Sequence, residues 1–143
     1  MPIILTQTDT TVGFLSQDAQ KLCDIKSRPS SKPFIRVYKD FKSFINDGKR
    51  VPKKRKKLIR RSKKTTFIIG DFSFRIAKVP LHSQFLRDTP WFYSTSANRS
   101  GEHFERAFCE AKADIIIEES ERLREKSASK VIKINAKKWR RLR

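Results

Sequence analysis

The sequence predicts a single α/β domain in which short strands alternate with helices. Short apolar runs are separated along the chain by segments with helical spacing of apolar residues, which is the order expected of strands and their connecting helices. A length of 143 residues is enough for one domain, and no linker is long enough to divide it. Hydrophobic residues make up 37% of the chain, including eleven Phe, so a core can form and disorder throughout is excluded.

The first elements are a strand, a polar loop and a helix. Ile3 to Leu5 is apolar and predicts a short buried strand, and Thr6 to Thr11 predicts a loop. Ser16 is expected to cap a helix that ends before Pro29, because residues before proline avoid the α region. The buried face of this helix is expected to carry Ala19, Leu22 and Cys23.

The middle of the chain predicts further strands and helices in alternation. Residues 34–38 have the pattern of a strand, and residues 40–46 that of a short helix with Phe41, Phe44 and Ile45 inward and Gly48 as its C-cap. Two strands are expected at 65–69 and 72–79, on either side of Gly70-Asp71. Pro80 is expected to open a short helix through Phe85 and Leu86.

The last third predicts three strands and two helices. The strands are expected at 91–95, 115–117 and 131–134. An amphipathic helix should follow the loop 96–101, with Phe104, Ala107, Phe108 and Ala111 on its apolar face. A charged helix is expected from Glu118 to Lys126.

Several classes of site are excluded by composition. The four glycines cannot form either of the common glycine-rich phosphate loops. Cys23, Cys109, His82 and His103 lack the spacing of metal ligands, so we expect no protein metal site and read the cysteines as small buried residues of a reducing cytosol. Because no apolar run approaches the roughly 20 residues of a membrane helix and the N-terminus has no signal-peptide pattern, we expect a soluble cytoplasmic protein.

Two polar clusters follow apolar elements, which is where α/β sheets place ligands. Residues 26–33 offer three cations over seven positions in a segment stiffened by two prolines, and residues 94–101 offer hydroxyls, an amide and the start of a helix. Together they could bind an anion without a glycine loop. Taken alone, each cluster is equally compatible with an ordinary turn or helix cap.

Three segments in order resemble the signature segments of the YrdC/YciO family. They are residues 8–14 (TDTTVGF), residues 25–35 with Lys26-x-Arg28, and residues 95–101 with Ser96-x-Asn98. A weaker likeness runs through residues 74–76 and 129–132 to Arg143, so the resemblance spans nearly the whole chain. It implies a twisted mixed sheet with flanking helices around a concave, positively charged cavity.

The resemblance also implies an activity, threonylcarbamoyl-AMP synthesis from L-threonine, bicarbonate or CO₂, and ATP, for threonylcarbamoyl modification of tRNA adenosine. No enzyme nucleophile is required, since positioning and charge neutralisation supply the catalysis. Magnesium is expected to accompany the ATP phosphates rather than occupy a protein cage. By the same resemblance, the catalytic residues would be Lys26, Arg28, Ser96 and Asn98; ATP would be bound by these four with Lys32 and Arg143; and threonine would be bound by Thr8, Arg75, Ser94 and Ser129.

The chain departs from the family pattern at three places. An aromatic residue of the first segment is replaced by Val12, a histidine by the region of Arg36 and Val37, and a Trp-Pro-Gly-Pro segment by the basic stretch before Thr65. These changes affect the expected threonine side more than the phosphate side. Nucleotide binding is therefore better supported by the sequence than threonine specificity.

Two segments carry more than half of the cations that give the chain a formal charge of +19. Residues 49–64 contain eleven Lys or Arg, residues 130–143 contain seven, and neither contains an acid. One such run is usually a solvated face, but two together favour a polyanion, bound through its phosphates without base specificity. The expected RNA-binding residues are Lys53, Lys54, Arg55, Lys56, Lys57, Arg60 and Arg61, and Trp139 could stack on a base.

Two functions therefore compete. The first is a minimal threonylcarbamoyl-AMP synthase in which the basic surface contacts RNA or tRNA. The second is an RNA-binding member of the family without synthase activity. They differ in whether Val12 and Val37 leave room for threonine.

Overall fold

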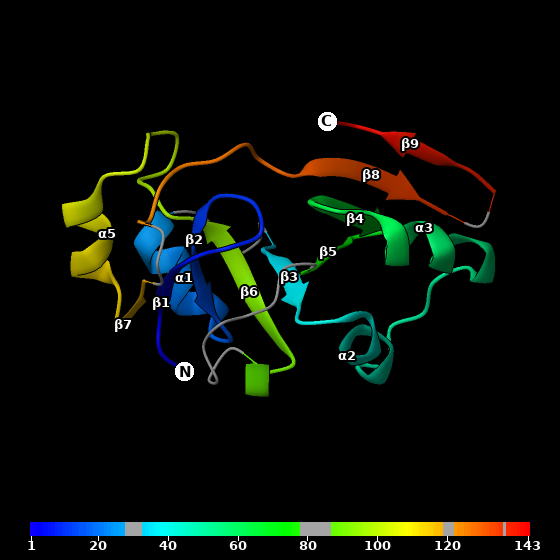
Figure 1. The fold of residues 1–143 in the computed structure, drawn as a ribbon, viewed down its shortest axis with the longest axis horizontal. Helices are drawn as coiled ribbons and strands as arrows, with labels where there is room; N and C mark the ends of the chain where they lie inside the picture. The colour runs from blue at the N-terminus through cyan, green and yellow to red at the C-terminus, as the bar shows by residue number, and fades with distance from the viewer. Residues whose placement is uncertain (28–32, 78–86, 119–121, 136) are drawn as a thin grey trace. The chain divides into compact units, whose positions relative to one another are not determined.

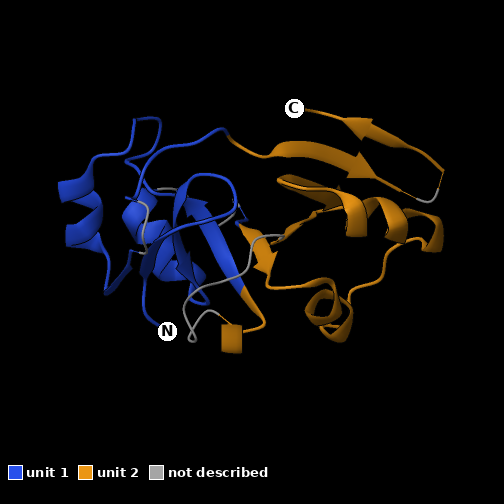
Figure 2. Ribbon diagram, in the orientation of Figure 1, with its two compact units in different colours: residues 1–34, 92–127 blue, residues 35–91, 128–143 orange. Residues whose placement is uncertain are grey.

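The computed structural model describes residues 1–27, 33–77, 87–118, 122–135 and 137–143 (Figure 1). The chain forms two compact units, each built from two stretches of sequence (Figure 2). Unit 1 is Met1–Phe34 with Phe92–Ser127, and unit 2 is Ile35–Trp91 with Ala128–Arg143. The strands form mixed parallel and antiparallel pairs, as the sequence predicted for this α/β fold.

Unit 1 holds a mixed sheet in the order β7-β1-β2-β6. β1 is antiparallel to β2, β2 is antiparallel to β6, and β7 runs parallel to β1 with Ile4 beside Ile115. The elements of this unit are β1 (Ile4–Gln7), β2 (Val12–Ser16), α1 (Ala19–Lys26), β6 (Trp91–Ser96, its first residue in unit 2), α5 (Arg106–Lys112) and β7 (Ile115–Ile117).

The two faces of this sheet differ in character. Alternate residues of β1 and β2 enter a hydrophobic core with Leu22 and Cys23 of α1 and Cys109 of α5. The other face carries the intervening residues, and strand register places Gly13 directly opposite Ser96 on it. Cys23 and Cys109 are buried and free, as predicted.

Helix α1 begins two residues later than predicted. Asp18, not Ser16, is its N-cap, and its carboxylate accepts a hydrogen bond from the Lys21 amide at 3.2 Å. Ser16 lies in β2, and its hydroxyl accepts from the Asp18 amide at 3.0 Å. The helix ends at Lys26 because Ser27 adopts the left-handed conformation, with φ of 49°.

In unit 2 the strand order of the sheet is β3-β5-β4-β8-β9. β3 is parallel to β5 and β8 is parallel to β4, while the β4–β5 and β8–β9 pairs are antiparallel. The elements are β3 (Ile35–Tyr38), α2 (Phe41–Asn46), the 3₁₀-helix η1 (Lys53–Arg55), α3 (Lys56–Arg61), β4 (Thr65–Ile69), β5 (Phe72–Ile76), β8 (Lys130–Ile134) and β9 (Trp139–Arg141).

The core of unit 2 is aromatic and lies on one face of this sheet. Phe44 of α2 stacks on Phe74 of β5 with ring centroids 4.4 Å apart, and Tyr38 meets Phe44 edge to face. Ile59 of α3 is completely buried in the same cluster. The basic stretch is therefore attached to the core through α3. This helix was not predicted, because cations occupy most of its positions.

Three details of the predicted helices are wrong. Ile45 of α2 is exposed rather than inward, and the C-cap is Asp47, with Gly48 following at φ of 76°. In α5 the buried residue is Cys109, while Ala107 and Ala111 are exposed. The predicted helix at 80–86 lies outside the described residues.

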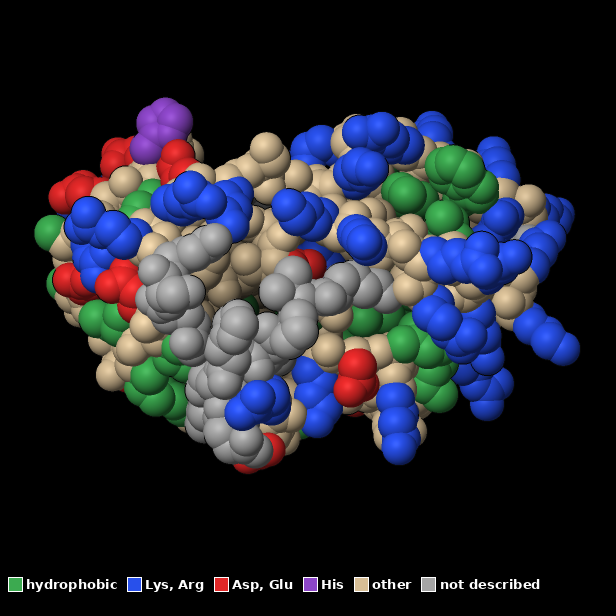
Figure 3. All heavy atoms as spheres, viewed as in Figure 1, with side chains coloured by type: hydrophobic (Ala, Val, Ile, Leu, Met, Phe, Trp, Pro, Cys, Tyr) green, Lys and Arg blue, Asp and Glu red, His purple; other side chains and the backbone are tan. Residues whose placement is uncertain are grey.

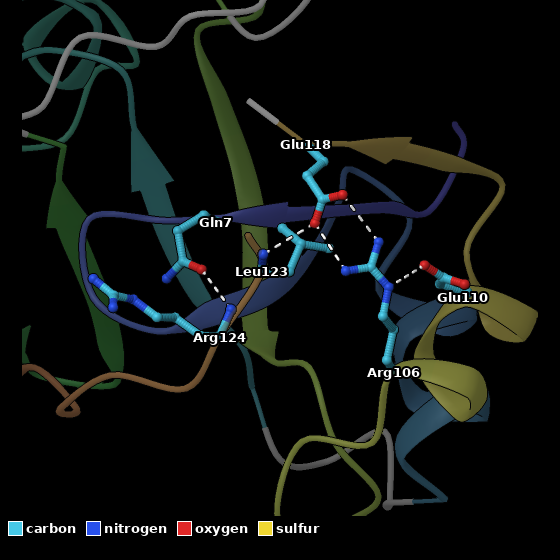
Figure 4. Close-up of polar contacts among 6 residues, drawn as sticks. All are labelled: Gln7, Arg106, Glu110, Glu118, Leu123 and Arg124. Carbon is cyan, nitrogen blue, oxygen red and sulfur yellow. Dashed lines mark hydrogen bonds and ion pairs between the residues drawn. The ribbon is translucent and has the colours of Figure 1, made fainter. Parts of the chain in front are cut away.

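The predicted charged helix from 118 to 126 is wrong for the described residues of that range, which are extended or irregular. Two of their backbone amides bond to side-chain oxygens instead of to a helical carbonyl (Figure 4). The Leu123 amide donates to Glu118 at 3.1 Å, and the Arg124 amide donates to Gln7 of β1 at 3.0 Å. Arg106 of α5 holds Glu118 by two further hydrogen bonds, of 2.9 and 3.0 Å.

None of the helices within the described ranges has the length and hydropathy of a membrane-spanning segment.

Candidate functional site

In unit 1 the structure brings together two of the predicted motif elements, which lie seventy positions apart in sequence. Lys26 is the last residue of α1, and its Nζ donates to the backbone oxygens of Ser96 at 3.0 Å and Asn98 at 2.9 Å. It also donates to Oδ1 of Asn98. The lysine is only 5% exposed. A buried ammonium is tolerated here because oxygen acceptors surround it.

Asn98 organises the loop that follows β6. Its Oδ1 accepts hydrogen bonds from Lys26 and from the Ser96 hydroxyl, the latter at 3.0 Å, and its Nδ2 donates to the Glu102 backbone oxygen. The loop then turns at Gly101 with φ of 78°. Ser96, Asn98 and Lys26 thus form one hydrogen-bonded unit that fixes the end of the strand.

This geometry gives Lys26 both a structural and an electrostatic effect. Its hydrogen bonds hold the 96–98 loop, while its charge makes the strand end attractive to an anion. Cys109 lies buried nearby, and burial raises the pKa of its thiol, although the charge of Lys26 acts in the opposite direction. Cys109 is therefore a packing residue and not a nucleophile.

Two predicted threonine-binding residues, Thr8 and Ser94, converge on Gly13 of β2. A Cβ at Gly13 would lie 3.1 Å from Cγ2 of Thr8 and 3.7 Å from Oγ of Ser94. It would also lie 3.1 Å from the Thr95 backbone oxygen, so only glycine fits without a shift. The Thr8 hydroxyl donates to the Thr11 carbonyl at 2.7 Å.

Gly13 was not predicted as a site residue, although a glycine inside a strand indicates a close approach of this kind.

In unit 2 three further predicted residues, Arg75, Ser129 and Arg143, lie around Thr66, which was not predicted as a site residue. Thr66 of β4 lies directly opposite Arg75 of β5, so their side chains share a face of the sheet, and both are buried. The Thr66 and Ser129 hydroxyls are 2.7 Å apart. Arg143 donates through Nε to the Ser129 carbonyl at 3.0 Å. The face carrying these groups is opposite the aromatic core.

Two replaced positions have clear structural roles. Val12 is buried in the core of unit 1, and Arg36 forms an ion pair with Asp47 at 3.0 Å while its guanidinium lies 4.0 Å from the Trp91 ring centroid. Val37 is beside Arg75 in the β3–β5 register and is half-buried. Arg28 and Lys32 lie outside the described residues.

The predicted RNA-binding residues occupy η1 and α3. Lys53, Lys54, Lys57, Arg60 and Arg61 are exposed, and Lys56 is half-exposed. Arg55 donates through Nε to the Asn135 carbonyl at 3.1 Å. The guanidinium of Arg60 lies 4.7 Å from the ring centroid of Phe41.

Comparison with known proteins agrees with the resemblance in the sequence. The family model for Sua5, YciO and YrdC proteins, described as telomere recombination, matches residues 2–143. No curated protein matches the sequence closely enough to count as a relative.

Several solved structures share the fold. P. abyssi Sua5 complexed with L-threonine matches with a TM-score of 0.74 and 19% identity, over 99% of this chain and 50% of that one. E. coli YciO matches with a TM-score of 0.74 and 17% identity, over 99% of this chain and 82% of that one. Full-length HypF in its phosphate- and nucleotide-bound form has the same TM-score at 16% identity, over 99% of this chain and 26% of that one. The chain spans about half the length of the Sua5 proteins that it matches.

Proposed function

Because the chain belongs to the Sua5/YciO/YrdC family, we propose that it is a threonylcarbamoyl-AMP synthase that uses L-threonine, bicarbonate and the magnesium complex of ATP. The threonine amine would combine with bicarbonate to form a carbamate and release water. A carbamate oxygen would then attack the α-phosphorus of ATP, and pyrophosphate would leave with the electron pair of the broken P–O bond. The product, threonylcarbamoyl-AMP, would serve threonylcarbamoyl modification of tRNA adenosine.

The observation that best supports this proposal is the meeting of Lys26 with Ser96 and Asn98 in unit 1. Two motif elements chosen from the sequence for nucleotide binding form one structure, although nothing in their spacing required it. A fixed loop beside a buried positive charge suits an anionic transition state, because preorganised charge does not have to reorganise during reaction.

We assign the nucleotide phosphates to Lys26, Arg28 and Lys32, with Ser96, Asn98 and Arg143 bonding phosphate or ribose. In this scheme Lys26 acts through its charge and through the loop that it holds, since its hydrogen bonds go to the loop oxygens. Magnesium would be coordinated by phosphate oxygens, which suits a set of hydroxyl, amide and cationic residues that lacks carboxylates.

We assign the threonine carboxylate to Arg75 and its remaining polar contacts to Thr8, Ser94 and Ser129. Arg75 is suited to the role because a guanidinium binds a carboxylate through two parallel hydrogen bonds. Its burial, at 4% exposure, would strengthen such a pair by reducing solvent screening. Thr66 then has a positioning role, since its hydroxyl bonds with that of Ser129.

The test is pyrophosphate release from ATP, measured with and without L-threonine and bicarbonate. The synthase should require both, together with magnesium. Arg75→Gln should raise KM for threonine roughly ten- to a hundredfold, the cost of one charged hydrogen bond, with little change in KM for ATP. Lys42→Gln, which removes an exposed cation of α2, is the matched control and should leave both values unchanged.

The same assay separates the alternative. A protein that binds ATP or RNA but never releases pyrophosphate in response to threonine would be the family member without synthase activity. An equal rise of KM for threonine in the Arg75 and Lys42 variants would instead remove Arg75 from the proposed site.

A further inference from the structure

The net positive charge of the molecule comes from one of its two units. Unit 2 contains 24 of the 34 Lys and Arg residues and only four acids, whereas unit 1 contains 10 Lys and Arg against 11 Asp and Glu. Unit 1 is thus slightly acidic, and the formal charge of +19 belongs entirely to unit 2. A segregation of this size indicates a polyanionic partner for unit 2 rather than general solubility.

Within unit 2 the two basic segments form one surface. Arg55 of η1 bonds to the carbonyl of Asn135, which lies between β8 and β9. Ile59 of α3 packs in the same core as Ile132 and Ile134 of β8, so α3 covers the sheet beside that hairpin. Figure 3 shows Lys and Arg side chains crowded over this part of unit 2, with no acidic side chain among them in that view.

An exposed aromatic residue lies on the same side of the sheet. Trp139 pairs with Ile134 across the β8–β9 ladder, so both side chains project from the face that α3 covers. Ile134 is buried, but Trp139 is at the edge strand and is 51% exposed. Arg140 and Arg141 follow it and are exposed. A large aromatic ring left in water among cations is the arrangement that stacks on an unpaired base.

From these observations we propose that the surface formed by η1, α3 and the β8–β9 hairpin binds single-stranded nucleic acid, with its cations on the phosphates and Trp139 stacked on a base. A membrane surface fits less well, because Leu58 and Ile59 pack toward the core and leave α3 without an apolar face for lipid. An acidic protein surface offers charge, but its carboxylates carry no ring to stack on Trp139. Base identity is not read, so sequence preference should be small.

The first experiment measures binding of a fluorescein-labelled oligouridylate of about 20 nucleotides at several KCl concentrations, with the full chain. The triple variant Lys53→Gln, Lys54→Gln and Lys57→Gln should reduce the slope of log Kd against log salt concentration by about 2. Each lost phosphate contact contributes about 0.7 to this slope on a single strand. The matched control removes three exposed cations of unit 1, by Lys21→Gln, Lys112→Gln and Arg122→Gln, and should leave the slope unchanged. Equal flattening by both variants would overturn the proposal.

The second experiment tests the stacking. Trp139→Ala should weaken oligouridylate binding roughly five- to a hundredfold, Trp139→Phe should restore most of the loss, and binding of an RNA duplex of equal length should change little. Oligothymidylate should behave as oligouridylate does, since both offer phosphates and unpaired bases. An unchanged Kd for Trp139→Ala, an equal loss on duplex, or tighter binding to anionic vesicles or polyglutamate would overturn the proposal.

Threonine-dependent pyrophosphate release is measured on the same variants. It should be unchanged, because none of these residues is assigned to threonine or ATP. The two proposals can therefore fail separately.

Discussion

At the scale of single residues, Lys26 shows that a residue of a predicted binding motif can also have a structural role. Its ammonium has three N–H donors, and the structure gives it three oxygen acceptors at the end of β6 and in the loop that follows. Lys26 belongs to no apolar face of the sequence, yet it is buried in the structure. It therefore has a part in folding, because removing it would leave oxygens of Ser96 and Asn98 without their donor.

Lys26→Met should lower the free energy of unfolding by about 2 to 3 kcal/mol, the range for a lost charged hydrogen bond with unsatisfied partners. The measurement is urea denaturation followed by circular dichroism. Lys21→Met is the control on the same helix, since Lys21 is exposed and its Nζ contacts only the Met1 carbonyl, at 3.2 Å, among the described groups. Equal stability of the two variants would contradict the structural role.

Gly13 makes a second residue-scale prediction. Gly13→Ala should destabilise the protein by about 1 to 3 kcal/mol, because the new methyl group would press on the Thr95 backbone oxygen and on Cγ2 of Thr8. Adding Thr8→Ser removes that Cγ2 and should recover part of the loss. A neutral Gly13→Ala variant in urea denaturation would show that β2 and β6 can separate at little cost.

At the scale of elements, much of the fold could be predicted because the apolar pattern was clear. The strands at 35–38, 65–69 and 72–76 were confirmed with small differences at their ends. β2 and β9 were not predicted. β2 contains a glycine and is buried on both faces, so it lacks the alternation of a half-buried strand, and β9 is mostly cationic. α3 was missed because its single fully buried residue, Ile59, stands among cations.

The residues of the candidate site also differ in whether the sequence could predict them. Charged and amide groups such as Lys26 and Asn98 could be selected from the sequence as potential ligands of an anion. Gly13 and Thr66 could not be selected in this way. Glycine has no side chain and threonine only a small hydroxyl group, so the role of each depends on which residues pack beside it in the fold. Partner choice across a sheet depends on register, which local sequence does not determine.

The segment after β7 gives a prediction about pH. Hydrogen bonds from Arg106, helped by the Leu123 amide, lower the pKa of Glu118 from 4.5 to about 2. A carboxyl group whose pKa is lower in the folded state stabilises the folded protein above pH 4.5, and this contribution is lost as the pH falls toward 2. Amide exchange of Leu123, corrected for its intrinsic rate, should therefore lose protection through this window.

Arg124 supplies the control within the same segment. Its amide bonds to the neutral side chain of Gln7 at 3.0 Å, so its protection should depend less on pH (Figure 4). Glu118→Ala should make the Leu123 amide exchange faster at neutral pH, because the variant removes its hydrogen-bond acceptor. Identical pH profiles for the two amides in the native protein would mean that the ion pair with Arg106 does not hold the segment.

At the scale of the molecule, unit 2 depends on residues from both of its stretches. Ile132 and Ile134 of β8 complete a core whose other members lie between Tyr38 and Ile76. Ile134→Ala should cost about 2 to 5 kcal/mol and reduce amide protection across β4 and β8, which pair in parallel. Ile116→Ala, at an exposed position of β7, should cost far less. Comparable losses for the two would mean that the β8 contacts contribute little to the core.

The division of each unit into two stretches also determines the order in which the protein can fold. The chain passes from one unit to the other three times, after Phe34, Trp91 and Ser127. Neither unit can close around a continuous segment, and the β4–β8 pairing joins Thr65 to Lys130 across a long loop whose entropy is lost before the contact forms. Folding should accordingly be slow, in milliseconds to seconds, as for other folds with non-local contacts. During synthesis, β4 would present an open edge until β8 arrives, so the growing chain is most exposed to misassembly just before its last strands are made.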